Sequence, residues 1–149
     1  KHRKHPIVAP ASSHKGYSMS IDNRRSLLGT TDNPESKLDY IVTLQGRIGT
    51  TQSSRQATIQ LRYVPDRFVI EDTAFRKYLD ALADADWSTF EKLAALILHD
   101  LNNVIVARWT QVQVNVAKLA QTEGSERLHT VTIEDHQPHW DNPAILNRL

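Results

Sequence analysis

The spacing of apolar residues changes twice along this chain, and this change restricts the fold more than any other feature. Between residues 38 and 63 apolar and polar residues alternate, which is typical of half-buried strands. Between residues 71 and 102 apolar residues recur every three or four positions, which predicts two amphipathic helices. Alternation returns in a long strand at residues 106–116 and in a last strand near residues 127–135. The predicted order is therefore β-β-α-α-β-β.

Two hairpins that flank a helix pair restrict how the layers can pack. We expect an α+β fold, in which a four-stranded antiparallel sheet carries both helices, near residues 71–84 and 88–102, on one face. The opposite face should be wet or meet another subunit, because polar residues alternate with the valines of the third strand. These polar residues are Gln111, Gln113 and Asn115. A homo-oligomer is the expected state.

The start of the second predicted helix carries a capping signal. Ser88 and Glu91 fit a capping box, in which Ser88 is the N-cap and Glu91 reaches back to the N-cap amide. This pattern gives Glu91 a purely structural role. That interpretation competes with the ligand-binding role considered below.

The basic residues concentrate at the beginning of the chain. Residues 1–18 hold four of the 18 Lys and Arg and no acidic residue, so the rest carries 14 basic against 17 acidic side chains. A nucleic-acid-binding domain normally has a basic surface on its folded part, and nucleic acid is therefore an unlikely partner. No apolar run reaches the ~20 residues of a membrane span. We expect a cytoplasmic protein without a membrane partner.

The composition also predicts three regions. Residues 1–37 are expected to form a basic and polar extension, disordered or in part appended to the native chain, in which residues 20–37 are a lead-in loop. Residues 38–137 are expected to form the folded domain. Residues 138–149 are expected to form a C-terminal tail.

The chain contains no cysteine. Disulfides, thiolate nucleophiles and Cys-ligated metals are excluded, because each of them needs the sulfur atom. Any chemistry must use His, carboxylate, hydroxyl, Lys or Arg side chains. His136 and His139 lie close together near the C-terminus, but zinc sites use at least three protein ligands. We therefore expect no metal site.

Three segments resemble one known family. Residues 59–66 read Ile-Gln-Leu-Arg-Tyr-Val-Pro-Asp, and residues 71–79 read Glu-Asp-Thr-Ala-Phe-Arg-Lys-Tyr-Leu. Phe90 and Glu91 precede the run Ile-Leu-His-Asp-Leu at residues 97–101. With the β-β-α-α-β-β order, these segments resemble the QueF-type 7-cyano-7-deazaguanine (nitrile) reductases of the tunnelling-fold (T-fold) superfamily. The resemblance implies a T-fold that assembles into an oligomeric barrel.

The resemblance also implies a binding site. In the family a glutamate at the start of the second helix anchors the edge of a planar purine analogue, and Glu91 stands at that position. A carboxylate suits this role because it accepts two parallel N–H bonds. Phe90 replaces a family histidine that supports proton transfer. Glu71 belongs to the segment linked to the nicotinamide cofactor, where Thr73 replaces a lysine and Arg76 keeps a basic side chain. The implied substrate-binding residues are Glu91, Glu71 and Phe90, while Arg76 is an implied cofactor contact and NADPH is suggested by resemblance alone.

The catalytic loop of the reductases has no counterpart in this chain. In the family a cysteine of that loop forms a thioimide with the nitrile, and a following aspartate acts as the acid. Counting back without gaps from Ala57 places Ile48 and Arg55 at these positions. An apolar side chain is no nucleophile, and a guanidinium keeps its proton. The resemblance therefore implies an inherited fold and pocket without Cys-dependent nitrile reduction.

Three functions remain open at this point. The first is an oligomer that binds a purine, deazapurine or pterin-like ring at subunit interfaces through Glu91, with acid/base chemistry if it is an enzyme. The second is a noncatalytic assembly or binding subunit. The third is an altered NADPH-dependent 7-cyano-7-deazaguanine reductase. The connection from Arg47 to Arg55 can be an anion cradle or a plain hairpin loop, and His129 is left unassigned.

Overall fold

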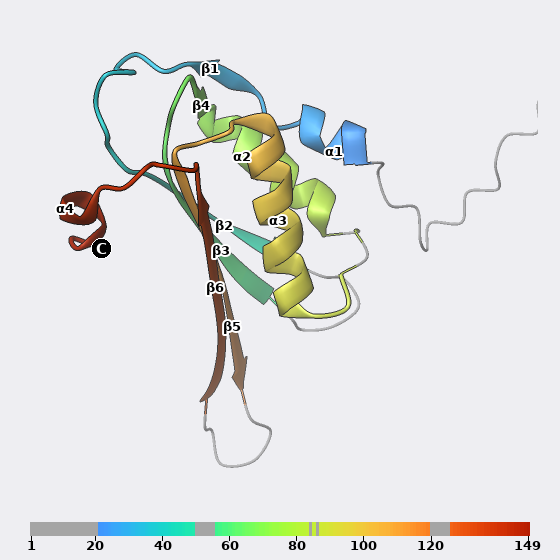
Figure 1. The fold of residues 1–149 in the computed structure, drawn as a ribbon. Helices are drawn as coiled ribbons and strands as arrows, with labels where there is room; N and C mark the ends of the chain where they lie inside the picture. Colours follow the sequence, from blue (N-terminus) through green and yellow to red (C-terminus); the bar gives the residue numbers. More distant parts are fainter. Residues whose placement is uncertain (1–20, 50–55, 84, 86, 120–125) are drawn as a thin grey trace, which may run out of the picture.

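A four-stranded antiparallel sheet organises the molecule (Figure 1). The computed structural model describes residues 21–49, 56–83, 85, 87–119 and 126–149. The sheet has the strand order β2-β3-β5-β6, and its strands are β2 (Val42–Gly49), β3 (Gln56–Val64), β5 (Trp109–Leu119) and β6 (Glu126–His136). The predicted α+β class and the two predicted hairpins are confirmed.

The register of the sheet explains the alternation in the sequence. Leu61 lies opposite Leu44 on one side and Val112 on the other, and Val112 lies opposite Ile133. These side chains share one face, on which Ile59, Leu61, Val112 and Val114 are fully buried. The predicted start of the first strand near Leu38 is wrong, because β2 begins at Val42. The Leu38 carbonyl instead accepts a hydrogen bond from the Arg108 guanidinium at 3.0 Å.

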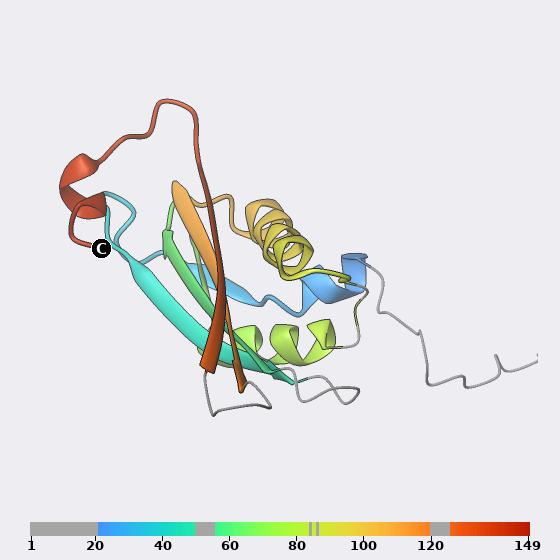
Figure 2. The ribbon, with the colours of Figure 1, turned by 90° about the horizontal axis from the view of Figure 1, so that it is seen from below.

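Helices α2 (Asp72–Leu82) and α3 (Phe90–Val104) cover this apolar face (Figure 2). Each helix buries a stripe at helical spacing, which includes Phe75 and Leu79 in α2 and Leu93 and Ile97 in α3. The helix pair predicted from periodicity is thus confirmed, with ends shifted by one or two residues. Strand β2 approaches α2 closely at Gly46. A Cβ atom added to this glycine would lie 2.5 Å from Cδ1 of Leu79.

The predicted capping box is wrong by one residue. The N-cap of α3 is Thr89, whose hydroxyl accepts a hydrogen bond from the Lys92 amide at 3.1 Å. Ser88 therefore lies outside the helix, and Lys92 takes the third helical position that the capping box assigns to the glutamate. Glu91 is one position too early for the reach-back bond of a capping box, and its carboxylate contacts its own backbone amide and His129 instead.

The predicted lead-in loop at residues 20–37 is also wrong over two stretches. Helix α1 (Ile21–Ser26) is formed there, and strand β1 (Thr30–Asp32) pairs with β4 (Phe68–Ile70). The prediction failed because these elements are short and polar, so apolar periodicity does not mark them. The expectation for residues 1–18 lies outside the described residues.

A buried ionic cluster attaches α1 to the helix pair. Asp100 of α3 is 1% exposed and accepts hydrogen bonds from Arg24 at 2.7 Å and from Arg25 at 2.9 Å. The Tyr78 hydroxyl of α2 donates a third. Burial alone would raise the pKa of the Asp100 carboxyl, but the bonds from Arg24, Tyr78 and Arg25 outweigh it and hold that pKa below its usual range. One carboxylate thus joins three helices.

The face of the sheet away from the helices is polar, except at one end. Trp109 belongs to this face by alternation, yet it is 1% exposed, and its indole N–H donates to Glu134 at 3.1 Å. The strand predicted at residues 106–116 corresponds to β5, which begins at Trp109 and not at Val106. The positive φ of 44° at Val106 breaks the extended backbone there. Two buried polar atoms on the polar face, Nε of Arg62 and Oε1 of Gln111, have no hydrogen-bond partner within the described part of the chain.

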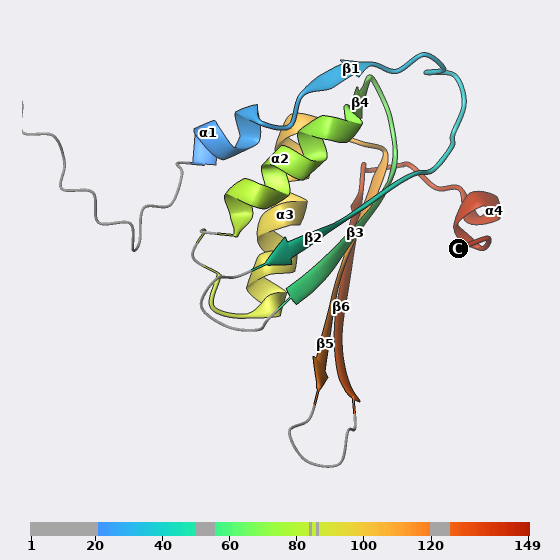
Figure 3. The ribbon, with the colours of Figure 1, turned by 180° about the vertical axis from the view of Figure 1, so that it is seen from behind.

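The C-terminal segment lies on the side of the sheet opposite α2 and α3 and ends in helix α4 (Pro143–Leu146) (Figure 3). Trp140 and Asn142 both donate hydrogen bonds to Asp39, at 3.1 and 3.0 Å. Among the described residues, no helix is long and apolar enough to cross a membrane.

Candidate functional site

A small pocket lies where α3 begins, beside strand β6. Its lining consists of consecutive residues before and within the first turn of α3, together with one residue of β6: Trp87, Ser88, Thr89, Phe90, Glu91 and His129. The pocket has a volume of about 200 Å³. Of the residues predicted to bind substrate, Phe90 and Glu91 therefore meet here.

The Glu91 carboxylate pairs with His129 across this pocket. Nε2 of His129 lies 3.1 Å from Oε1 of Glu91, and the two side chains remain 49% and 63% exposed. A hydrogen bond from its own backbone amide, followed by the contact with His129, lowers the pKa of Glu91. The carboxylate is thus ionised at neutral pH and accepts hydrogen bonds without donating any.

Three rings form the wall of the pocket. The centroids of Trp87 and Phe90 are 5.8 Å apart, and the Phe90 and His129 rings meet edge to face at 5.2 Å. The Trp87 indole is fixed by a hydrogen bond to the Leu82 carbonyl at 3.1 Å. A flat ring placed against such a wall would bury its faces on aromatic surface, while its edge meets the Glu91 carboxylate.

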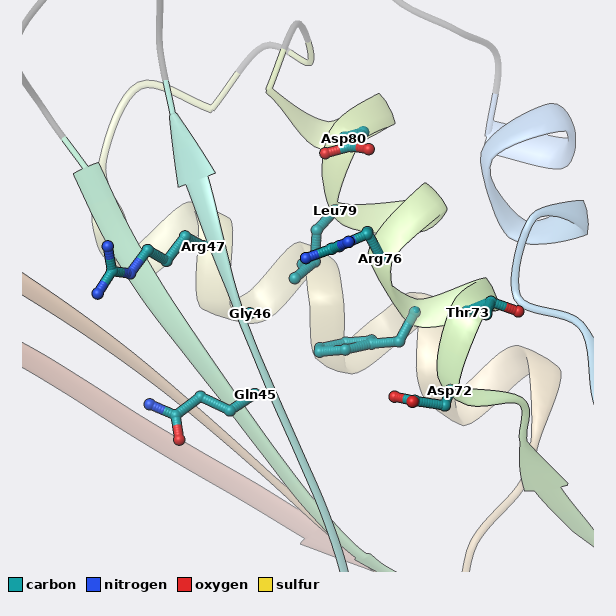
Figure 4. Close-up of a pocket in the computed structure, with 9 residues that line it drawn as sticks. Gln45, Gly46, Arg47, Asp72, Thr73, Arg76, Leu79 and Asp80 are labelled. Atoms are coloured by element: carbon teal, nitrogen blue, oxygen red, sulfur yellow. The ribbon is translucent and has the colours of Figure 1, made fainter.

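A larger groove lies between α2 and the edge strand β2 (Figure 4). It has a volume of about 830 Å³, and its charged lining residues are Arg47, Asp72, Arg76 and Asp80. Asp72 and Asp80 stand four residues before and after Arg76, so all three lie on one face of α2. The predicted cofactor contact Arg76 therefore lies between two carboxylates.

Glu71 does not lie with Glu91. It is the N-cap of α2, directly after β4, whereas Glu91 lies in the first turn of α3, at the other end of the helix pair (Figure 1). The Glu71 side chain makes no capping hydrogen bond and lies against Gly29, where an added Cβ would be 3.3 Å from its Oε2. The two predicted ligand residues therefore occupy separate places within one chain.

The positions aligned with the family's catalytic loop offer no reactive group. Ile48 is 1% exposed and belongs to the helix-covered face of β2. Arg55 lies outside the described residues, as does the whole stretch from residue 50 to residue 55. Among the described residues no cluster of three or more His, Cys, Asp or Glu side chains could hold a metal ion. Nδ1 of His136 is 2.9 Å from the Gln137 carbonyl, a local backbone contact.

Two of the three ring side chains of the pocket, Trp87 and His129, were not predicted to have a role in it. His129 shares the helix-covered face of β6 with Val131 and Ile133, so its alternation with them did contain a signal. That signal did not say which helix residue His129 would meet, because the meeting depends on how α3 crosses the sheet. Trp87 lies in a connection without periodicity, and nothing in the sequence marked it.

One comparison with known protein families gives a match. The family described as "QueF-like protein" matches residues 56–119. The central part of this chain is thus similar to the QueF-like family. The matched segment runs from β3 to β5 and contains Glu71, Phe90 and Glu91, while His129 of β6 lies outside it. A search of curated proteins found no match. The chain has no cysteine anywhere, so the thiol nucleophile of the nitrile reductases has no counterpart in it.

Proposed function

We propose that this chain binds a planar nitrogen heterocycle of the purine, deazapurine or pterin class, with Glu91 as the anchor of its N–H edge. The observation that carries the proposal is the ionised Glu91 carboxylate beside the Trp87, Phe90 and His129 rings in one pocket. A carboxylate that accepts two N–H bonds is a strong and directional contact. The aromatic wall supplies the apolar surface that a flat ring needs.

We further propose that the pocket is completed by a neighbouring subunit in a T-fold oligomer. A volume of about 200 Å³ is below the ~300–1,000 Å³ of typical ligand clefts, and 63% of the Glu91 side chain is exposed. In such an assembly Glu71 of one chain is proposed to approach the Glu91 pocket of another.

The proposal does not include nitrile reduction. The nucleophile position is the buried Ile48, and no thiol exists in the chain. The groove beside Arg76 also fits NADPH poorly, since the two guanidinium groups of Arg47 and Arg76 are balanced by the carboxylates of Asp72 and Asp80. Phosphate groups placed there would meet negative charge at close range. If the protein is an enzyme, its chemistry is proposed to use carboxylate and imidazole groups.

A noncatalytic assembly subunit is the second candidate. The polar sheet face and the edge strands β2 and β6 favour it, because unpaired strand edges promote association. An oligomer by light scattering that binds no heterocycle would support this candidate over the first.

The proposed function predicts a preference for rings with a 2-amino group. We expect calorimetric titration of the native protein to give at least ~10-fold tighter binding of guanine than of hypoxanthine, which has the same ring without that group. The reason is the loss of one charge-assisted bond to Glu91, worth about 1.5–3 kcal/mol. Equal affinities, or no binding of either ring, would contradict the proposal.

A further inference from the structure

The Glu91 pocket presents more than a carboxylate to a bound ring. Nε2 of His129 lies 3.1 Å from Oε1 of Glu91, so Oε2, Oε1 and Nε2 offer three neighbouring hydrogen-bonding atoms. Their chemistry follows from the charge of the carboxylate. Because ionised Glu91 only accepts, Nε2 of His129 must carry the proton of their hydrogen bond. The set is thus acceptor, acceptor, donor.

This set of three atoms is complementary to one particular ring edge. A 2-amino-oxo ring of the guanine or pterin type offers an amino donor, a ring N–H donor and a carbonyl acceptor in sequence along one edge. The two donors match the oxygens of Glu91. The carbonyl oxygen of the ring then lies next to Oε1 of Glu91, on the side of His129. The N–H group of His129 Nε2 can donate to this oxygen if it gives up its hydrogen bond to Glu91.

The position of His129 is fixed by two independent elements. Its backbone belongs to β6 and pairs with Val116 of β5, and its ring packs edge to face on Phe90 of α3 at 5.2 Å. Packing and strand pairing thus hold the imidazole beside Glu91, which limits the entropy lost on binding. A donor held in this way discriminates against ligands that cannot accept its bond.

We propose that His129 is a specificity-determining residue that reads the carbonyl oxygen of a 2-amino-oxo heterocycle, while Glu91 reads the adjacent N–H groups. This inference rests on the proposed function, because it assumes that Glu91 holds the N–H edge. It adds a second contact, made by a residue outside the family-matched segment. Rings with a weak acceptor beside the N–H edge are the disfavoured ligands.

The test compares guanine with 6-thioguanine, in which a sulfur atom, a weak acceptor, replaces the carbonyl oxygen and both N–H groups remain. We expect native protein to bind guanine about 10-fold more tightly, the value of one hydrogen bond to a held donor. In His129→Phe, which keeps a ring on Phe90 but no donor, this ratio should fall to about one. His129→Gln keeps an N–H donor and should restore part of it. An unchanged ratio in His129→Phe would overturn the inference.

The same titrations separate this inference from the proposed function. Guanine and hypoxanthine differ at the group that Glu91 reads, so their ratio should stay at least ~10-fold in His129→Phe. One outcome is that the guanine to hypoxanthine ratio persists in His129→Phe, while the guanine to 6-thioguanine ratio is the same in native protein and in this variant. In that case only the proposed role of His129 is contradicted. If native protein does not distinguish guanine from hypoxanthine, the Glu91 proposal fails, and the inference about His129 falls with it.

Discussion

Asp100→Asn should lower the free energy of unfolding by about 3–5 kcal/mol, the usual cost of breaking a buried ion pair. Asp100 is 1% exposed and faces the guanidinium groups of Arg24 and Arg25. The amide has no charge, so the buried Arg24 cation would lose its counterion. Urea unfolding followed by circular dichroism measures the change. The protein concentration should be the same in every experiment, because the stability of an oligomer depends on it.

The matched control is Asp80→Asn, an exposed carboxylate on α2, which should change the free energy by less than ~0.5 kcal/mol. The effect of Asp100→Asn should also depend on pH. The folded-state pKa of Asp100 is lowered, so its contribution is complete above the unfolded-state value of about 3.9 and is lost as the pH falls through the folded value. The difference from native protein should therefore shrink below about pH 4. Equal stability of both Asn variants at pH 7 would contradict the buried cluster.

Trp109→Ala should also destabilise the protein by about 3–5 kcal/mol, as expected for removal of a buried tryptophan. The Trp109 side chain is 1% exposed within a single chain, on the sheet face that is otherwise polar. Its removal leaves a cavity and removes the hydrogen bond to Glu134. Urea unfolding by circular dichroism is again suitable, because the signal does not depend on tryptophan emission.

Two variants separate packing from hydrogen bonding at this position. Trp109→Phe keeps an aromatic ring and should cost clearly less than Trp109→Ala, mainly the bond to Glu134 of about 1 kcal/mol. Trp87→Ala removes a partly exposed indole from the pocket and should also cost less. If Trp109→Ala were no more destabilising than Trp87→Ala, Trp109 would not be a core residue of the folded chain.

The sequence predicted the layers of this fold because its apolar spacing records them. Strands β2, β3, β5 and β6 each have one buried face, and α2 and α3 each have one buried stripe, so their periods are clear. Helix α1 was not predicted, because an ion pair and not an apolar stripe joins it to the other helices. Arg24 and Asp100 are 76 residues apart, and no local sequence pattern indicates their pairing. The burial of Trp109 escaped for a similar reason, since alternation alone places it on the polar face.

The candidate site was predictable only in part. Phe90 and Glu91 followed from the family resemblance, and the structure places both in one pocket. The mistaken cap at Ser88 shows how a one-residue error changes a role, because with Thr89 as the N-cap Glu91 is the second helical residue and not the third, from which the reach-back bond is made. The meeting of Glu91 with His129 joins residues 38 positions apart and depends on how α3 crosses β6. Such a contact has no signature in a single sequence.

The most direct test of the proposed function is the guanine affinity of Glu91→Gln, measured by calorimetric titration. The amide keeps the shape of the side chain but replaces one acceptor by a donor, which would face an N–H group of the ring. We expect the dissociation constant to rise about 10–100-fold, with Glu35→Gln, a change at an exposed glutamate in the segment between β1 and β2, as the unaffected control. Equal guanine binding by native protein and Glu91→Gln would contradict the anchoring role of Glu91.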